Sequence, residues 1–215
     1  MRRLAGALRP DVAVILAVAK HLGVPLEESA SVVRCSAPYT ARLEPVPLPC
    51  GAIVIRDDYS ASIDTFEAAL KFLREARAQR RILVFTDISD SGDNNRRRKL
   101  RSLAAAVSGW LDVLILCGEE QVYGTRKVIE AGASAHGFQT LREAAQFLRT
   151  ELRPGDLVLL KGRATDHATR VFFALLGTVA CWRAYCPKTM LCDGCWELGF
   201  EPETGYRPPS TGLRV

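Results

Sequence analysis

The chain has 215 residues, which is enough for one well-packed domain and a smaller appendage. Its 48% hydrophobic and 25% charged residues are ordinary for a globular protein. The net charge of +5 suits an anionic ligand such as a nucleotide but is too small to indicate a nucleic-acid-binding protein. The longest apolar run, around residues 12–19, is too short to span a membrane, and Asp11 interrupts its start. We therefore expect a cytoplasmic protein with no membrane span.

The first part of the chain predicts two helices, an edge strand and a buried strand. Apolar residues at helical spacing indicate a helix that ends before Gly23, and a second helix runs from Pro25 to about Arg34. Residues 43–48 contain prolines, which are tolerated in an edge strand. Residues 52–55 form the next expected strand, and residues 63–78 the next helix.

From residue 82 onward, predicted strands and helices alternate. Continuous apolar runs such as Ile82–Phe85 are typical of strands buried on both faces. The expected strands are 82–85, 113–116, 134–137 and 157–160, and the expected helices are 94–107, 122–131, 140–151 and 165–175. The helix near residue 140 begins with a capping box, Thr140 to Glu143. This alternation predicts an α/β fold with three layers and a mostly parallel, Rossmann-like sheet.

Acidic and hydroxyl side chains gather in the turn between the strand at 52–55 and the following helix. Such a turn lies at the carboxyl end of a strand, where α/β proteins usually bind their ligands. Asp64 has a simpler explanation as the cap of the helix, with Glu67 at the capping-box position. That explanation leaves Asp57, Asp58 and Tyr59 without a role.

This turn resembles the start of the C-terminal domain of the Mur ligases, the ATP-dependent enzymes that add amino acids to the peptidoglycan precursor. The D-alanyl-D-alanine-adding members have Asp-Asp-Ser-Tyr-Asn-Ala-Asn-Pro here, followed by Ser and Phe or Met. The positions retained are Asp57, Tyr59, Ala61 and Phe66, and the departures are Arg56, Asp58, Ser60, Ser62 and Ile63. The family's upstream Gly-Arg-x-Glu is matched by residues 41–44, at the family's spacing from Asp57. The resemblance implies that Arg42, Asp57 and Tyr59 bind ATP.

Two later loops extend the resemblance. Residues 86–92 match the family's Gly-Asp-Met-x-Glu-Leu-Gly at Asp87 and Gly92, with Asp90 in place of Glu. Lys161 and Gly162 match the family's Lys-Gly-Ser, with Arg163 in place of Ser. The resemblance implies a substrate-binding role for Asp87, Asp90, Gly92, Lys161 and Gly162. The alternative for residues 86–92 is an ordinary turn at the N-terminus of a helix. The alternative for Lys161 is a lysine that is solvated at the end of a strand.

The phosphate-binding loop that a ligase needs, Gly-x-x-x-x-Gly-Lys-Ser/Thr, does not occur in the sequence. The resemblance covers about residues 10–176 and includes almost none of the ATPase domain. The chain alone is therefore not expected to catalyse ligation. Its implied cofactors, ATP and Mg²⁺, would be shared with, or held by, a P-loop domain or the subunit of a split ligase. The other implied partner is an anionic cell-wall precursor or amino-acid substrate.

Four of the seven cysteines lie close together near the C-terminus, at positions 181, 186, 192 and 195. A Cys-x-x-Cys turn directs two thiolates at one metal ion, so Cys181, Cys186, Cys192 and Cys195 predict a structural zinc site. An iron–sulfur cluster is the less favoured occupant. The alternative is a set of reduced thiols, with Trp182 and Trp196 packed on the sheet.

The sequence thus predicts three parts: a helical remnant of the central ligase domain (1–37), a Mur-ligase-like C-terminal α/β domain (38–178) and a Cys-rich, zinc-binding tail (179–215). The favoured function is the nucleotide- and substrate-closing domain of an ATP-dependent amide-bond ligase of peptidoglycan biosynthesis. One alternative is a non-catalytic scaffold module that uses the cysteines to bind a partner. Another is a zinc-containing nucleic-acid binder that uses Arg96–Arg101, although no interleaved aromatic residues are available for base stacking.

Overall fold

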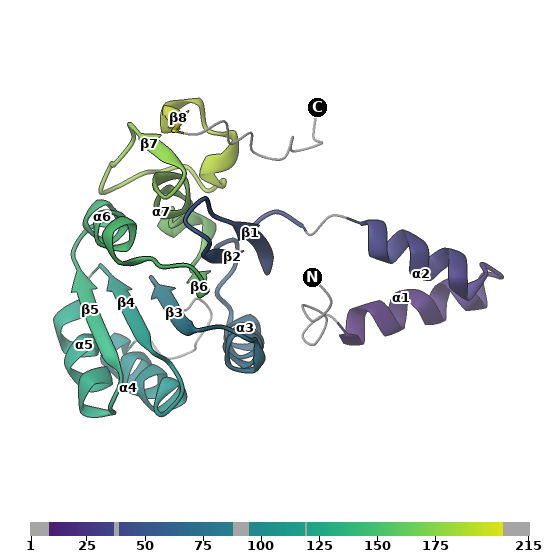
Figure 1. Ribbon diagram of the computed structural model, residues 1–215, viewed down its shortest axis with the longest axis horizontal. Coiled ribbons are helices and arrows are strands. Elements are labelled where there is room, and N and C mark those ends of the chain that lie inside the picture. Colours follow the sequence, from purple (N-terminus) through teal and green to yellow (C-terminus); the bar gives the residue numbers. More distant parts are fainter. Residues whose placement is uncertain (1–8, 37–38, 88–94, 119, 204–215) are drawn as a thin grey trace.

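The computed structural model describes residues 9–36, 39–87, 95–118 and 120–203, and a six-stranded sheet forms its centre (Figure 1). The strand order is β1-β2-β6-β3-β4-β5. The strands are β1 (Glu44–Pro47), β2 (Ile53–Asp57), β3 (Arg80–Phe85), β4 (Val113–Cys117), β5 (Ser134–Phe138) and β6 (Asp156–Lys161). The strands β2 to β6 pair in parallel, and β1 is the antiparallel edge strand. The predicted α/β fold with a mostly parallel sheet is confirmed.

Helices cover both faces of the sheet and complete the three layers. One face packs against α3 (Ile63–Glu75), α4 (Arg96–Val107) and α5 (Gln121–Glu130). The other packs against α6 (Leu141–Glu151) and α7 (Thr169–Ala174). Successive residues of β6 alternate between these two cores, as the pleat of a strand requires. This alternation explains why the central strands are apolar along their whole length.

Three details at helix ends test the predictions from local sequence. The capping box of Thr140 and Glu143 at the start of α6 is confirmed. The predicted capping role of Asp64 is wrong, because the N-cap position is Ser62, in an extended conformation, and Asp64 lies inside the first turn of α3. The helix expected over residues 165–175 is shortened to α7. A 3-10 turn, η1 (Ala164–Asp166), and a left-handed His167 with φ 56° precede it.

Two N-terminal helices, α1 (Arg9–His21) and α2 (Leu26–Cys35), pack against each other and stand apart from the sheet in Figure 1. This hairpin leaves large apolar side chains exposed, namely Val14, Ile15, Val18, Leu22, Leu26 and Val32. No helix within the described ranges is both long enough and apolar enough to cross a lipid bilayer.

The Cys-rich segment after α7 is anchored to the domain. Its ends, β7 (Gly177–Val179) and β8 (Phe200–Pro202), pair with each other as an antiparallel ribbon. Between them lie two 3-10 turns, η2 (Cys192–Gly194) and η3 (Trp196–Leu198). Cys192 and Leu198 are buried in the core formed with α6 and α7. The described part of this segment is therefore a folded cover over that core.

We expect Leu159→Ala in β6 to lower the free energy of unfolding by about 3 kcal/mol, because Leu159 is fully buried in a central strand and its truncation leaves a cavity. Urea denaturation measures this change. The control is Ile129→Ala on the exposed face of α5, which should alter stability by less than about 0.5 kcal/mol. Equal losses for the two variants would contradict the assignment of β6 to the centre of the core.

Candidate functional site

A buried ion pair joins the carboxyl ends of β2 and β6. Asp57 and Lys161 are register partners, and the Nζ atom of Lys161 lies 2.6 Å from the Asp57 carboxylate. The same ammonium group donates to the carbonyl of Ser60 at 2.7 Å and to the hydroxyl of Thr65 at 3.4 Å. The Lys161 side chain is fully buried, so the alternative of a lysine solvated at the end of a strand is wrong.

Burial works against the charges of this pair. It raises the pKa of Asp57 and lowers the pKa of Lys161, and the close contact between the two groups opposes both shifts. The second oxygen of the Asp57 carboxylate accepts a hydrogen bond from the backbone N–H of Leu43 at 3.1 Å. Both Asp57 oxygens are thus engaged, and the carboxylate fixes the neighbouring turn at residues 41–44.

That turn presents Arg42 at the surface. Ala41 and Leu43 on either side of it have left-handed backbones, with φ of 58° and 47°, which is uncommon for residues other than glycine. The backbone N–H of Ala41 donates to Glu44 at 2.9 Å, and its carbonyl accepts from the N–H of Tyr59 at 3.3 Å. The turn is therefore held by its own acidic residue and by the loop that follows β2.

Arg42 forms a cation–aromatic cluster with two tyrosines. Its guanidinium carbon lies 4.5 Å from the centre of the Tyr59 ring and 5.7 Å from that of Tyr39. The two tyrosine rings meet edge to face, 6.1 Å apart. A guanidinium group binds phosphate and an exposed aromatic ring stacks on a base, so this cluster has the chemistry that a nucleotide requires.

The loop after β3 reaches the same edge of the sheet. Asp87 lies 3.5 Å from Arg163 and 3.9 Å from Lys99. A Cβ atom on Gly162 would lie 2.4 Å from the Thr86 hydroxyl, so the loops after β3 and β6 approach closely here and a larger residue would force Thr86 to move. The structure thus brings Asp87 and Gly162 to the edge that carries Asp57 and Lys161. Asp90 and Gly92, the other predicted substrate residues, lie outside the described residues.

A second charged network lies on the opposite face of β2 and was not predicted as part of the site. Asp193 receives two hydrogen bonds from Arg56, at 2.6 and 2.9 Å. Asp58 lies 3.4 Å from Arg56 and accepts a hydrogen bond from the Thr169 hydroxyl. Burial opposes the charge on Arg56, but Asp58 and Asp193 outweigh it, and the pKa of Arg56 is raised. In the sequence, this network could have been inferred from Arg56 and Asp58, two charged residues that flank Asp57 at the end of an apolar strand.

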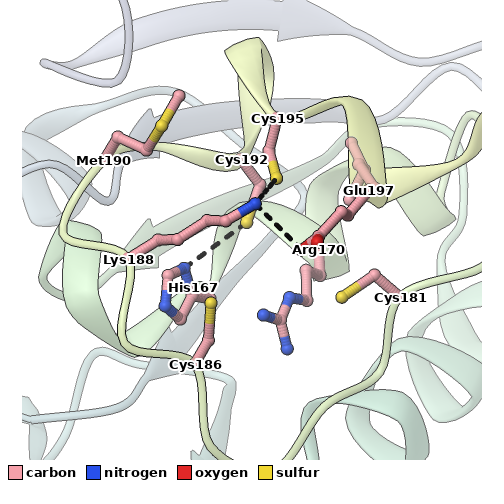
Figure 2. Close-up of a pocket in the computed structure, with 10 residues that line it drawn as sticks. His167, Arg170, Cys181, Cys186, Lys188, Met190, Cys192, Cys195 and Glu197 are labelled. Carbon is pink, nitrogen blue, oxygen red and sulfur yellow. Dashed lines mark hydrogen bonds and ion pairs between the residues drawn. The ribbon is translucent and has the colours of Figure 1, made fainter.

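The four predicted zinc ligands line one pocket of the Cys-rich segment together with His167 (Figure 2). The Nζ atom of Lys188 lies 3.3 Å from the Cys195 sulfur and 2.8 Å from Glu197. Desolvation disfavours the Cys195 thiolate, but the hydrogen bond from Lys188 helps to outweigh it, and the pKa of Cys195 is lowered. The Cys192 sulfur lies 3.5 Å from Nδ1 of His167.

This arrangement does not support the zinc prediction. Among the described residues, no three His, Cys, Asp or Glu side chains are placed to hold one metal ion. An ammonium group, that of Lys188, sits against the Cys195 thiol instead. The alternative, free thiols with both tryptophans packed on the sheet, agrees with the structure only in part. Trp182 packs on the core and donates to the Val179 carbonyl at 2.8 Å, whereas Trp196 is 85% exposed.

Comparison of the chain with known proteins points to one family. The family model described as Mur ligase, glutamate ligase domain, matches residues 41–164. The UDP-N-acetylmuramoylalanine–D-glutamate ligase of Hahella chejuensis is 28% identical over 145 residues, which make up 67% of this chain and 31% of that ligase.

Solved structures share the fold. MurF from Acinetobacter baumannii matches with a TM-score of 0.62 and 23% identity, over 73% of this chain and 35% of that chain. The MurF ligase from Thermotoga maritima in complex with ADP matches with a TM-score of 0.58 and 19% identity, over 74% of this chain and 35% of that chain. The chain thus spans about a third of the length of these relatives.

We expect Lys161→Met to lower the free energy of unfolding by about 3 to 5 kcal/mol, because it leaves the Asp57 carboxylate buried without its counter-charge. Adding Asp57→Asn removes that charge and should recover part of the loss. Urea denaturation of the two single variants and the double variant gives the coupling between the sites. Strictly additive losses would show that the two side chains do not act as an ion pair.

The Cys-rich segment offers a test by metal removal. Because Lys188 pairs with Cys195 and Glu197, we expect a chelator such as EDTA to leave the melting temperature of the purified protein unchanged. Metal analysis by mass spectrometry should accompany the melting curves. Loss of one zinc ion per chain together with a fall in the melting temperature would establish the zinc site that the cysteine spacing predicts.

Proposed function

The chain belongs to the Mur ligase family through its C-terminal, glutamate ligase domain, and on this premise we propose that it is the nucleotide- and substrate-closing part of an ATP-dependent amide-bond ligase. The observation that carries the proposal is the exposed Arg42 turn, stacked on Tyr59 and fixed by the buried pair of Asp57 and Lys161. Cationic and aromatic groups lie here at the carboxyl edge of a parallel sheet, where α/β proteins bind nucleotides. The MurF ligase of Thermotoga maritima was solved in complex with ADP, which is consistent with this role.

The residues divide into those that touch the nucleotide and those that position them. Arg42 neutralises negative charge on the phosphates, and Tyr59 supplies an apolar ring beside it. Asp57 acts mainly as a positioning residue, because Lys161 and the Leu43 N–H occupy its two oxygens. Its effect on ATP therefore passes through the Arg42 turn.

The substrate side of the proposed site is the neighbouring loop pair after β3 and β6. Asp87 and Gly162 lie there, and Arg163 adds a half-exposed guanidinium group. A cation beside a carboxylate suits a zwitterionic amino acid or peptide, whose ammonium and carboxylate groups need opposite charges. In the complete reaction, the amine of this nucleophile would attack an acyl phosphate, forming the amide bond as the acyl carbon–oxygen bond breaks and phosphate leaves.

A separate P-loop domain completes the proposed enzyme, either on another subunit or elsewhere in a longer protein. That domain would hold the ATP phosphates and Mg²⁺, for which the described residues have no phosphate-binding loop. The exposed apolar side chains of the α1–α2 hairpin support such a partner, because contiguous apolar surface marks interaction sites. We propose that residues 1–37 belong with the central domain, residues 38–178 form the C-terminal domain and the Cys-rich segment follows them.

The second candidate is a non-catalytic scaffold that binds a partner through its Cys-rich segment. Two aromatic side chains there, Tyr185 and Trp196, are more than 80% exposed. Exposed aromatic residues are enriched at the centres of protein interfaces. This function needs no nucleotide, so a binding measurement separates it from the first.

The deciding experiment is calorimetric titration of the chain with the ATP analogue AMP-PNP and Mg²⁺, with and without the P-loop domain of a Mur ligase. We expect binding in the mixture to be stronger than the sum of the separate components. Arg42→Ala should weaken it by about tenfold or more, because a charged contact to phosphate is lost.

The matched control is Arg153→Ala, which removes an exposed arginine from the loop before β6, at the opposite edge of the sheet. It should leave the affinity unchanged. Equal affinities for Arg42→Ala and the wild type would remove Arg42 from the site. No contribution of the chain to binding in any mixture would favour the scaffold.

A further inference from the structure

The Cys-rich segment reaches the candidate site through one side chain, Asp193. This residue lies in the η2 turn between Cys192 and Cys195. Its carboxylate receives hydrogen bonds from both terminal nitrogens of Arg56, at 2.6 and 2.9 Å. The two residues are 137 positions apart in sequence. Bidentate contacts between arginine and a carboxylate fix orientation as well as distance.

Arg56 makes its shortest contacts to a carboxylate with Asp193. Its side chain is 2% exposed, so the positive charge needs a partner inside the protein. Asp58 and Glu44 lie 3.4 and 3.5 Å away, and the ring of Phe172 stacks at 4.6 Å. The contacts with Asp193 are the shortest of those to a carboxylate. Asp193 therefore sets where the guanidinium group sits.

The position of Arg56 is transmitted to the Arg42 turn along two contacts. Glu44, which Arg56 touches, also holds the backbone N–H of Ala41 at 2.9 Å and so closes that turn. Asp58, which Arg56 also touches, fixes the backbone directly before Tyr59. Thus the turn that carries Arg42 is held from one face of β2 by Asp57 and from the other by Arg56.

We propose that Asp193 is a positioning residue of the nucleotide site, acting through Arg56 on the turn that carries Arg42 and on the loop that carries Tyr59. The Cys-rich segment is then a working part of the site and not only a cover for the core. This inference rests on the nucleotide role proposed above. It adds that a residue near the C-terminus controls how well that nucleotide is held.

A purely structural role makes a different prediction. If Asp193 only anchored the Cys-rich segment, Asp193→Asn would lower stability but leave the affinity of folded molecules unchanged. The matched control is Glu203→Gln, which breaks another ion pair of this C-terminal region, that with Arg149 at 2.8 Å. The control removes the same kind of charge without touching β2.

The affinity for AMP-PNP and Mg²⁺ is measured by calorimetry in the presence of the P-loop domain, below the melting temperature of every variant. We expect Asp193→Asn to raise Kd about tenfold, as displacement of a binding group does, and Glu203→Gln to leave it unchanged. Asp193→Glu keeps the charge and should give an intermediate Kd. If Asp193→Asn does not fold, Asp193→Glu carries the test. Unchanged affinity in the folded Asp193 variants would overturn the proposal.

Backbone amide NMR of the isolated chain separates this inference from the proposed function. We expect the Arg42, Leu43 and Tyr59 amide resonances to shift in Asp193→Asn but not in Glu203→Gln. If the wild type fails to bind AMP-PNP, the nucleotide role fails. In that case these amide shifts alone test whether Asp193 positions the Arg42 turn. Unshifted resonances in Asp193→Asn would overturn the inference.

Discussion

The buried contact between Lys161 and Asp57 is the constraint on which the carboxyl edge of the sheet depends. An unpaired charge at this depth would cost several kcal/mol, and three neighbouring polar groups also hydrogen-bond to the pair. The Ser60 carbonyl and the Thr65 hydroxyl accept from the ammonium group, and the Leu43 N–H donates to the carboxylate. One ion pair thereby fixes the end of β2, the start of α3 and the left-handed turn around Arg42.

The end of β2 carries charge on both faces, which is unusual for a strand whose other residues are apolar. Asp57 points towards α3, while Arg56 points towards α7 and the Cys-rich segment. Each charge is matched by a residue from far along the chain, Lys161 on one face and Asp193 on the other. The end of β2 thus contacts both the end of β6 and the C-terminal cover.

Local patterns predicted most of the architecture because apolar strands and helix caps are encoded by neighbouring residues. The runs that became β3, β4 and β6, and the capping box at Thr140, are of this kind. The resemblance of the loops singled out Arg42 and Asp57 for the nucleotide and Lys161 for the substrate, but it did not predict that Lys161 and Asp57 form a buried ion pair. No local pattern shows that Arg56 pairs with Asp193, because the two residues are 137 positions apart and meet only through the packing of the Cys-rich segment against β2. Cysteine spacing likewise could not show that the Lys188 ammonium lies against Cys195.

The strand β6 lies between β2 and β3 in the sheet, although it comes after β4 and β5 in the chain. It follows β2 by about 100 residues and β3 by about 70. During synthesis, the edges by which β2 and β3 pair with β6 therefore stay unpaired until residues 156–161 have left the ribosome. Exposed strand edges of this kind are where nascent chains aggregate or recruit chaperones. The order of the strands thus makes β6 the strand whose synthesis allows the sheet to be completed.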